Sequence, residues 1–187
     1  MSLPQKNEHY TYADYCTWDD DKRWELIHGV AYAMAPAPSP IHQDISAELT
    51  FQLKAYLKGK PCKLFPAPFD VRLNADDEDD TVVQPDLTVV CDKSKIDDKG
   101  CRGVPDFVIE ILSPSNAKYD RWVKSNLYRS VKVREYWIVS PDEKIVDVYI
   151  LNDSDGNYIH KFYSEKDAAP VTALPGCQIN LQEVFAF

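Results

Sequence analysis

The pattern of apolar and polar positions predicts three helices. Between residues 41 and 58, apolar residues recur at steps of three and four, as in an amphipathic helix. Residues 10 to 21 suit a short helix that begins at a threonine cap and ends in three aspartates. A third helix is predicted after Ser113 or Ser115, either of which could cap it. Its apolar stripe consists of Tyr119, Val123, Leu127 and Val131.

Runs of β-branched and aromatic residues predict strands in most of the remaining chain. Residues 23–32 form two short strands that turn at His28-Gly29. In the run 82–90, Pro85 marks a break and places Asp86 near the start of the strand proper. Further strands are predicted at 63–65, 69–73, 107–112, 135–139, 145–151 and 158–163.

Composition indicates one soluble domain. A chain of 187 residues that is 44% hydrophobic can bury one core, so we expect a single domain over residues 1–187. The five cysteines are scattered without a Cys-x-x-Cys pair, which argues against a disulfide framework and a structural zinc site. No stretch approaches the roughly 20 apolar residues of a membrane span or resembles a signal peptide. We therefore expect a cytoplasmic protein that does not bind membranes.

Charge adds one restriction. The net charge is −9, so the lysine and arginine footprint of a nonspecific nucleic-acid binder is missing from the chain as a whole. Five of the acids form one run, residues 76–80. Such runs are usually solvated loops, so we assign this one no catalytic role.

Glu110 is the most informative charged residue, because it interrupts the otherwise apolar strand 107–112. A buried ionised carboxylate costs several kcal/mol unless a cation or hydrogen bonds compensate it. Asp106 lies four residues away on the same strand, or roughly 13 Å, too far to share one ion with Glu110. Asp86 begins a preceding strand, and neighbouring strands lie about 4.8 Å apart. Asp86 and Glu110 are therefore the predicted ligands of a divalent ion such as Mg²⁺.

A divalent ion held in this way can stabilise charge on a phosphodiester during hydrolysis. Such a reaction also uses a cationic side chain near the phosphate, and that residue is harder to place. In the common nuclease arrangement, a lysine stands two residues after the glutamate, but that position is Leu112. Asp120 and Lys124 are spaced i, i+4 at the edge of an apolar stripe, so Lys124 could reach back toward the sheet. Alternatively, the two form an exposed helix pair worth a few tenths of a kcal/mol.

Six motifs in a fixed order give the chain a resemblance to a known family. They are RWELIHG (23–29), APSPIH (37–42), QPDL (84–87), IEILSPS (109–115), DRWVK (120–124) and VREYWIV (133–139). Over residues 12 to 163 the chain resembles the Uma-two family of restriction endonucleases, in the PD-(D/E)xK nuclease superfamily. The resemblance implies an α/β fold with a restriction-endonuclease-like core. That core is a mixed central β-sheet flanked by helices, here with additional N-terminal and C-terminal β-hairpins.

The resemblance also implies an activity and its residues. The expected function is a Mg²⁺-dependent endonuclease, with Mn²⁺ as a substitute ion and DNA as the expected substrate. Asp86 and Glu110 match the metal-binding acids of the family, and Lys124 matches its helix-borne lysine. Four accessory candidates are Glu25, His42, Ser113 and Asp120.

Each accessory candidate also has an ordinary structural interpretation. Glu25 is a further acid of the site, a surface residue or a partner of Arg23. His42 falls within the apolar stripe of its helix, so it is either a satisfied core histidine or a residue that activates water. Ser113 is most simply a helix cap.

Two other functions compete with nuclease activity. The missing strand lysine and the acidic surface would also fit a nuclease fold that binds or regulates without cleaving. A glycosidase using Asp86 and Glu110 would require carboxyl groups about 5 to 10 Å apart. Nucleases that cut both strands commonly work as dimers, so a homodimer formed through the C-terminal hairpins is a further hypothesis.

Overall fold

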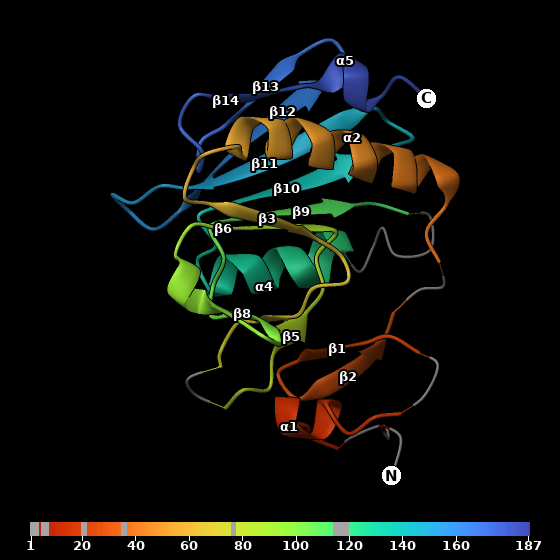
Figure 1. The fold of residues 1–187 in the computed structure, drawn as a ribbon, viewed down its shortest axis with the longest axis vertical. Coiled ribbons are helices and arrows are strands. Elements are labelled where there is room, and N and C mark those ends of the chain that lie inside the picture. The colour runs from red at the N-terminus through yellow and green to blue at the C-terminus, as the bar shows by residue number, and fades with distance from the viewer. Residues whose placement is uncertain (1–3, 5–7, 20–21, 35–36, 76–77, 114–119) are drawn as a thin grey trace.

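A mixed six-stranded sheet forms the centre of the molecule, as the computed structural model in Figure 1 shows. The structure describes residues 4, 8–19, 22–34, 37–75, 78–113 and 120–187. Among the strand pairs of this central sheet, β9 and β10 run parallel and the others are antiparallel. In spatial order the strands are β12 (Tyr158–Ser164), β11 (Ile145–Leu151), β10 (Glu135–Ser140), β9 (Phe107–Ile111), β6 (Leu87–Val90) and β3 (Lys63–Pro66).

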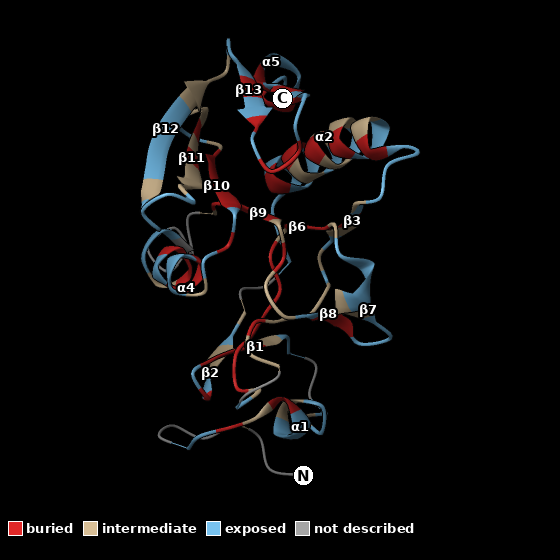
Figure 2. Cartoon of the chain, turned by 90° about the vertical axis from the view of Figure 1, so that its left-hand side faces the viewer, coloured by how far each residue is buried: buried red, intermediate tan, exposed pale blue. Residues whose placement is uncertain are grey.

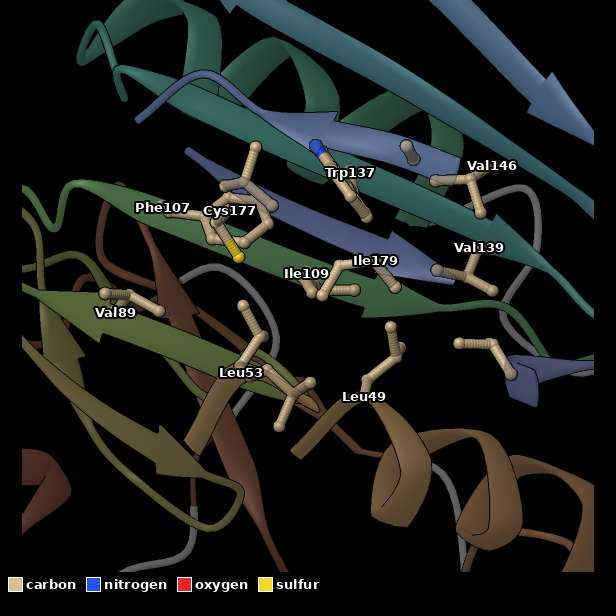
Figure 3. Close-up of a cluster of buried hydrophobic side chains, with 14 of the residues drawn as sticks. Leu49, Leu53, Val89, Phe107, Ile109, Trp137, Val139, Val146, Cys177 and Ile179 are labelled. Atoms are coloured by element: carbon tan, nitrogen blue, oxygen red, sulfur yellow. The ribbon is translucent and has the colours of Figure 1, made fainter. Parts of the chain in front are cut away.

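One face of the central sheet is covered by the long helix α2 (Pro40–Leu57) and the C-terminal elements (Figure 2). Helix α2 begins at Ser39, whose side-chain oxygen accepts a hydrogen bond from the His42 amide. Leu49 and Leu53 of α2 pack against Ile109 in a continuous apolar core (Figure 3). The C-terminal elements on this face are β13 (Ala168–Val171), β14 (Cys177–Asn180) and α5 (Leu181–Val184).

The opposite face of the sheet meets the helix that follows β9. This segment starts as a π-helical turn, η2 (Asp120–Lys124), and continues as α4 (Ser125–Ser130). Val108 of β9 packs with Leu127 and Tyr128 in a second core. Because side chains alternate along a strand, Glu110 faces the same layer as Val108.

A second mixed sheet lies beside the first and carries the N-terminal hairpin (Figure 1). Its hairpin turns at His28-Gly29, where both residues have positive φ. Helix α1 (Tyr12–Tyr15) packs against this hairpin, and a 3₁₀ turn, η1 (Lys93–Lys95), precedes β7. The order is β2 (Val30–Ala33), β1 (Trp24–Ile27), β5 (Val82–Val83), β4 (Val71–Arg72), β8 (Gly100–Arg102) and β7 (Ile96–Asp97).

The chain passes from the second sheet to the central sheet at residues 84–86, between β5 and β6. The break predicted at Pro85 is therefore confirmed, and its cause is a change of sheet. Because proline lacks the N–H that a strand ladder needs, it suits such a crossing point. Asp86 consequently sits at the junction between the two sheets.

Most predicted elements are present, with differences at particular places. The hairpin, α2, β9 and β10 to β12 are confirmed, whereas among the described residues of the helix predicted over 10–21 only the four of α1 are α-helical. Residues 92–103, where the sequence pattern predicts no helix or strand, contain η1, β7 and β8. For the third helix, Ser115 and Tyr119 lie outside the described residues. Among the described residues, none of the helices has the length and apolar composition needed to cross a membrane.

Two sequence-based interpretations need correction. Cys62 and Cys91 form a disulfide, because the antiparallel register of β3 and β6 places the two residues opposite each other. The acidic run is not simply solvated, since Asp80 is buried and accepts hydrogen bonds from Asn74 at 2.7 Å and Thr81 at 2.9 Å. Burial alone raises the pKa of Asp80, but these hydrogen bonds hold it below the ordinary value.

Candidate active site

Lys124 is buried between two glutamates. Its Nζ lies 3.0 Å from Oε1 of Glu25 and 3.1 Å from Oε1 of Glu110. Only 4% of Lys124, 3% of Glu25 and 4% of Glu110 is exposed. The interpretation of Lys124 as half of an exposed helix pair is therefore wrong, and its contact with the strand glutamate is confirmed. The Asp120 side chain lies outside the described part of the chain.

The helix that follows β9 positions this cation. Lys124 ends the π-helical turn η2, a type of turn that is rare and often found at functional sites. Four residues later, the Tyr128 hydroxyl donates to Oε1 of Glu110 at 2.5 Å. Complete burial, reinforced by the charge of Glu110, raises the pKa of Tyr128 well above its ordinary value. Tyr128 therefore remains a hydrogen-bond donor throughout the physiological pH range.

Glu25 reaches the site from the N-terminal hairpin. Strand β1 pairs with β5 at Leu26 and Val82, which brings Glu25 beside Gln84. The Gln84 amide donates to Oε1 of Glu25 at 2.8 Å. Arg23 donates to the side-chain oxygen of Gln84. The interpretations of Glu25 as a surface residue or as a partner of Arg23 are therefore wrong, because Glu25 is buried and pairs with Lys124.

Asp86 enters from the junction between the sheets. Its Oδ2 accepts a hydrogen bond from the Ile111 amide at 2.7 Å and lies 3.2 Å from Nε2 of His42. Strands β6 and β9 are adjacent, with Leu87 opposite Ile109, so the Asp86 backbone falls opposite Glu110. The predicted neighbourhood of the two acids is confirmed. His42 is buried, as expected of a core histidine, yet it also contacts Asp86.

The donor set fits a hard divalent cation held mainly by Asp86 and Glu110. The contacts of Asp86 with other described residues all fall on Oδ2, so its Oδ1 faces none of them. Within the described chain, the sole group of three potential ligands whose atoms lie within 4.8 Å of one another is His9, Glu78 and Asp80. Glu25, Asp86 and Glu110 do not converge as closely. Two carboxylates plus water match the way Mg²⁺ is commonly bound in proteins.

Comparisons with known proteins identify the family of the chain. The family model Uma2, described as "Putative restriction endonuclease", matches residues 11–182. The chain belongs to the Uma-two family. An uncharacterised protein of Synechocystis sp. is 29% identical over 157 residues, covering 82% of this chain and 80% of that protein.

A solved structure shares the fold. The crystal structure of a "putative nuclease" from Anabaena variabilis has a TM-score of 0.73 with this chain at 20% sequence identity. The match covers 95% of this chain and 98% of the other. The predicted restriction-endonuclease-like α/β fold, with its mixed central sheet and flanking helices, is confirmed.

In this Uma-two protein, a cavity of about 580 Å³ is lined by segments that adjoin the acid and lysine cluster and by the turn between β10 and β11, but Glu110 and Lys124 do not line it. Leu112 and Ser113 continue the chain beyond Glu110, and Ser39 and Ile41 lie just before His42. Arg121, three residues before Lys124, also lines the cavity and donates to Ser140 at 2.8 Å. Ser113 therefore lies in the cavity wall, whereas the residues it was expected to cap are outside the described chain.

The sequence analysis did not predict Tyr128 or Gln84 as members of the cluster, and it correctly excluded Asp106. Tyr128 could have been found from its i, i+4 spacing to Lys124, and Gln84 from its place beside Pro85 and Asp86. Gln84 matters because its side chain also donates to Asp70, which ties the connection between β5 and β6 to the start of β4. Asp106, excluded as a partner of Glu110, instead accepts a hydrogen bond from the Cys91 amide at 2.7 Å.

Proposed function

We propose that this protein is a Mg²⁺-dependent endonuclease that hydrolyses phosphodiester bonds in DNA, with Mn²⁺ as a substitute ion. The observation that carries the proposal is the contact between Lys124 and Glu110 next to Asp86, in a member of a restriction-endonuclease family. A cation and two acids at one sheet edge are the groups that phosphodiester hydrolysis requires. DNA is proposed because the family description names restriction endonucleases.

Asp86 and Glu110 would hold the divalent ion. When bound, the ion supplies Lewis acidity, which stabilises negative charge on the phosphate and makes water a stronger nucleophile. The Ile111 amide and His42 fix Oδ2 of Asp86, and Tyr128 fixes Oε1 of Glu110. These hydrogen bonds set the direction of both carboxylates before an ion arrives, which lowers the cost of binding it.

Lys124 supplies the fixed positive charge of the site. An ammonium group held in a buried position stabilises developing phosphate charge more strongly than one in water. Glu25 acts as a positioning residue, because its Oε1 contacts both Lys124 and the Gln84 amide. Lys124 thereby takes the place of the strand lysine that Leu112 replaces.

The organisation of the active protein is also part of this proposal. We propose one domain that acts in the cytoplasm as a homodimer. Strand β12 is an edge of the central sheet and leaves 69% of Phe162 exposed, which supports a contact between copies there.

A cleavage assay tests the proposal. The purified chain is incubated with supercoiled plasmid, single-stranded DNA and RNA, in Mg²⁺, Mn²⁺ or EDTA. We expect nicked or linear plasmid in either metal and none in EDTA. Asp86→Asn and Glu110→Gln, which keep side-chain size, should each lower the rate by a factor of about 10² or more.

A matched control separates the site from general charge effects. Lys144 and Glu165 form an exposed ion pair of 3.1 Å, similar in length to that of Lys124 and Glu110. Lys144→Met and Glu165→Gln should leave the cleavage rate within about twofold, because exposed pairs contribute little. If the native chain binds Mg²⁺ through Asp86 but cleaves no substrate, the protein is a binding module and the proposed activity is refuted.

A further inference from the structure

Four lysines surround one cavity at the far end of helix α2. The cavity has a volume of about 450 Å³ and lies between the last turn of α2 and strand β3, which Figure 1 shows as neighbouring segments. Its lining includes no acidic residue. This is a local excess of positive charge in a chain whose net charge is −9. The lysines are Lys54, Lys58, Lys60 and Lys63.

Helix stability alone does not account for this group. Lysines in the last turn of a helix favourably oppose its dipole, which explains Lys54 and Lys58. Lys60 and Lys63 lie beyond the helix, in the following turn and at the start of β3. None of the four forms an ion pair with a residue that the structure describes, although Lys60 lies 3.9 Å above the Tyr56 ring. The cavity therefore keeps most of its positive charge available to an outside anion.

We propose that this lysine cavity binds backbone phosphates of a nucleic acid substrate, away from the bond that is cut. This inference rests on the proposed nuclease function. Nucleic acid is a better occupant than a lone small anion, because one rigid element joins the cavity to the acid and lysine cluster. His42, in the first turn of α2, contacts Asp86, whereas Lys58 follows its last residue.

The length of α2 gives the span of the expected contact. Sixteen residues separate His42 from Lys58, which corresponds to about 24 Å along the helix. Phosphates on one strand of a duplex repeat about every 3.4 Å along its axis. A strand cut near Asp86 would therefore present phosphates to the lysines about seven nucleotides from the cut. The four lysines would thus bind phosphates locally, although the net negative charge of the whole chain does not predict binding to nucleic acid.

Binding measured without cleavage tests this inference. Fluorescence anisotropy would follow a labelled 20-base-pair duplex binding to the full chain carrying Glu110→Gln, over a range of salt concentrations. Replacing all four lysines by alanine in that chain should weaken binding at least tenfold. It should also reduce the slope of log affinity against log salt by about 3.6 when each lysine neutralises one phosphate, since each neutralised phosphate contributes about 0.9.

A second variant controls for lost charge. Lys93, Lys99, Lys161 and Lys166 are exposed on other parts of the protein, and replacing these four should change the affinity less than threefold. An equal loss in both variants, or unchanged affinity in the first, would overturn the inference. So would saturable binding of inorganic phosphate that needs the four lysines while duplex binding does not. Because binding is measured in Glu110→Gln, these outcomes are independent of whether the native chain cleaves DNA.

Discussion

Nζ of Lys124 lies 3.1 Å from Oε1 of Glu110, although fourteen residues separate them along the chain. The contact places a cation at the strand glutamate from a helix instead of from the strand itself. Leu112, at the usual lysine position, is buried in the core against that helix. Leu112 therefore helps to pack the helix against the sheet, and the helix in turn carries Lys124 to the strand glutamate.

Removing the buried cation should destabilise the protein. Lys124→Met would leave Glu25 and Glu110 as buried carboxylates without their cation, at a cost of about 3–5 kcal/mol in the free energy of unfolding. Urea denaturation in EDTA measures this loss. Lys144→Met, at the exposed pair, should cost less than about 1 kcal/mol. Equal losses in the two variants would show that Lys124 is not held as described.

Divalent metal should stabilise the folded chain. Binding of Mg²⁺ to the folded state alone, at a hundred times its dissociation constant, adds about 2.7 kcal/mol and raises the melting temperature. Differential scanning calorimetry with and without Mg²⁺ measures the shift. Asp86→Asn should remove most of it, whereas Glu78→Gln, in the separate group with His9 and Asp80, should not. The reverse pattern would move the metal site to that second group.

Buried tyrosines should make stability fall at alkaline pH. Burial raises the pKa of Tyr136 and Tyr158 to about 12, and that of Tyr128 well above its ordinary value of 10.0. Between pH 10 and 12 these groups lose protons in the unfolded state but keep them in the folded state, so stability decreases as pH rises. Denaturation curves at pH 8, 10 and 11 should show this decline. Tyr128→Phe should reduce it, and constant stability over that range would contradict the assignment.

Thiol labelling should distinguish the five cysteines. Burial raises the pKa of Cys101 and Cys177 to about 11, whereas Cys16 is exposed. At pH 8, iodoacetamide should modify Cys16 within minutes and leave Cys101 and Cys177 unmodified until the protein unfolds. Cys62 and Cys91 should react only after reduction and unfolding. Mass spectrometry of the peptides reads all five, and rapid labelling of Cys101 in the folded chain would contradict its buried position.

The main helix and the central strands could be predicted because each leaves a periodic pattern within its own stretch of sequence. The stripe of α2 and the buried run of β9 follow from periodicity, and Pro85 marked the strand break. The role of Glu25 did not follow, because it depends on the pairing of β1 with β5, whose residues are 56 apart at Leu26 and Val82. The Cys62–Cys91 disulfide and the burial of Asp80 likewise depend on long-range contacts.

The residues of the proposed site also divide into those that local patterns predict and those that long-range contacts bring in. Asp86 and Glu110 could be paired from strand adjacency, but a π-helical turn between β9 and α4 brings Lys124 to Glu110. No periodicity in the sequence distinguishes such a turn from an ordinary α-helix. Tyr128 and Gln84 bond to the two glutamates only because the helix and the sheet junction pack beside β9, and no local pattern in the sequence predicts that packing.

The rate of Mg²⁺-dependent DNA cleavage by Lys124→Met under single-turnover conditions tests the central claim most directly. The measurement uses folded variant, verified by circular dichroism and gel filtration, with saturating protein and Lys144→Met as the control. If Lys124 supplies the positive charge at Glu110, its loss lowers the rate by a factor of about 10² to 10³ and Lys144→Met matches the native chain. A rate for Lys124→Met within twofold of the native rate would contradict the account.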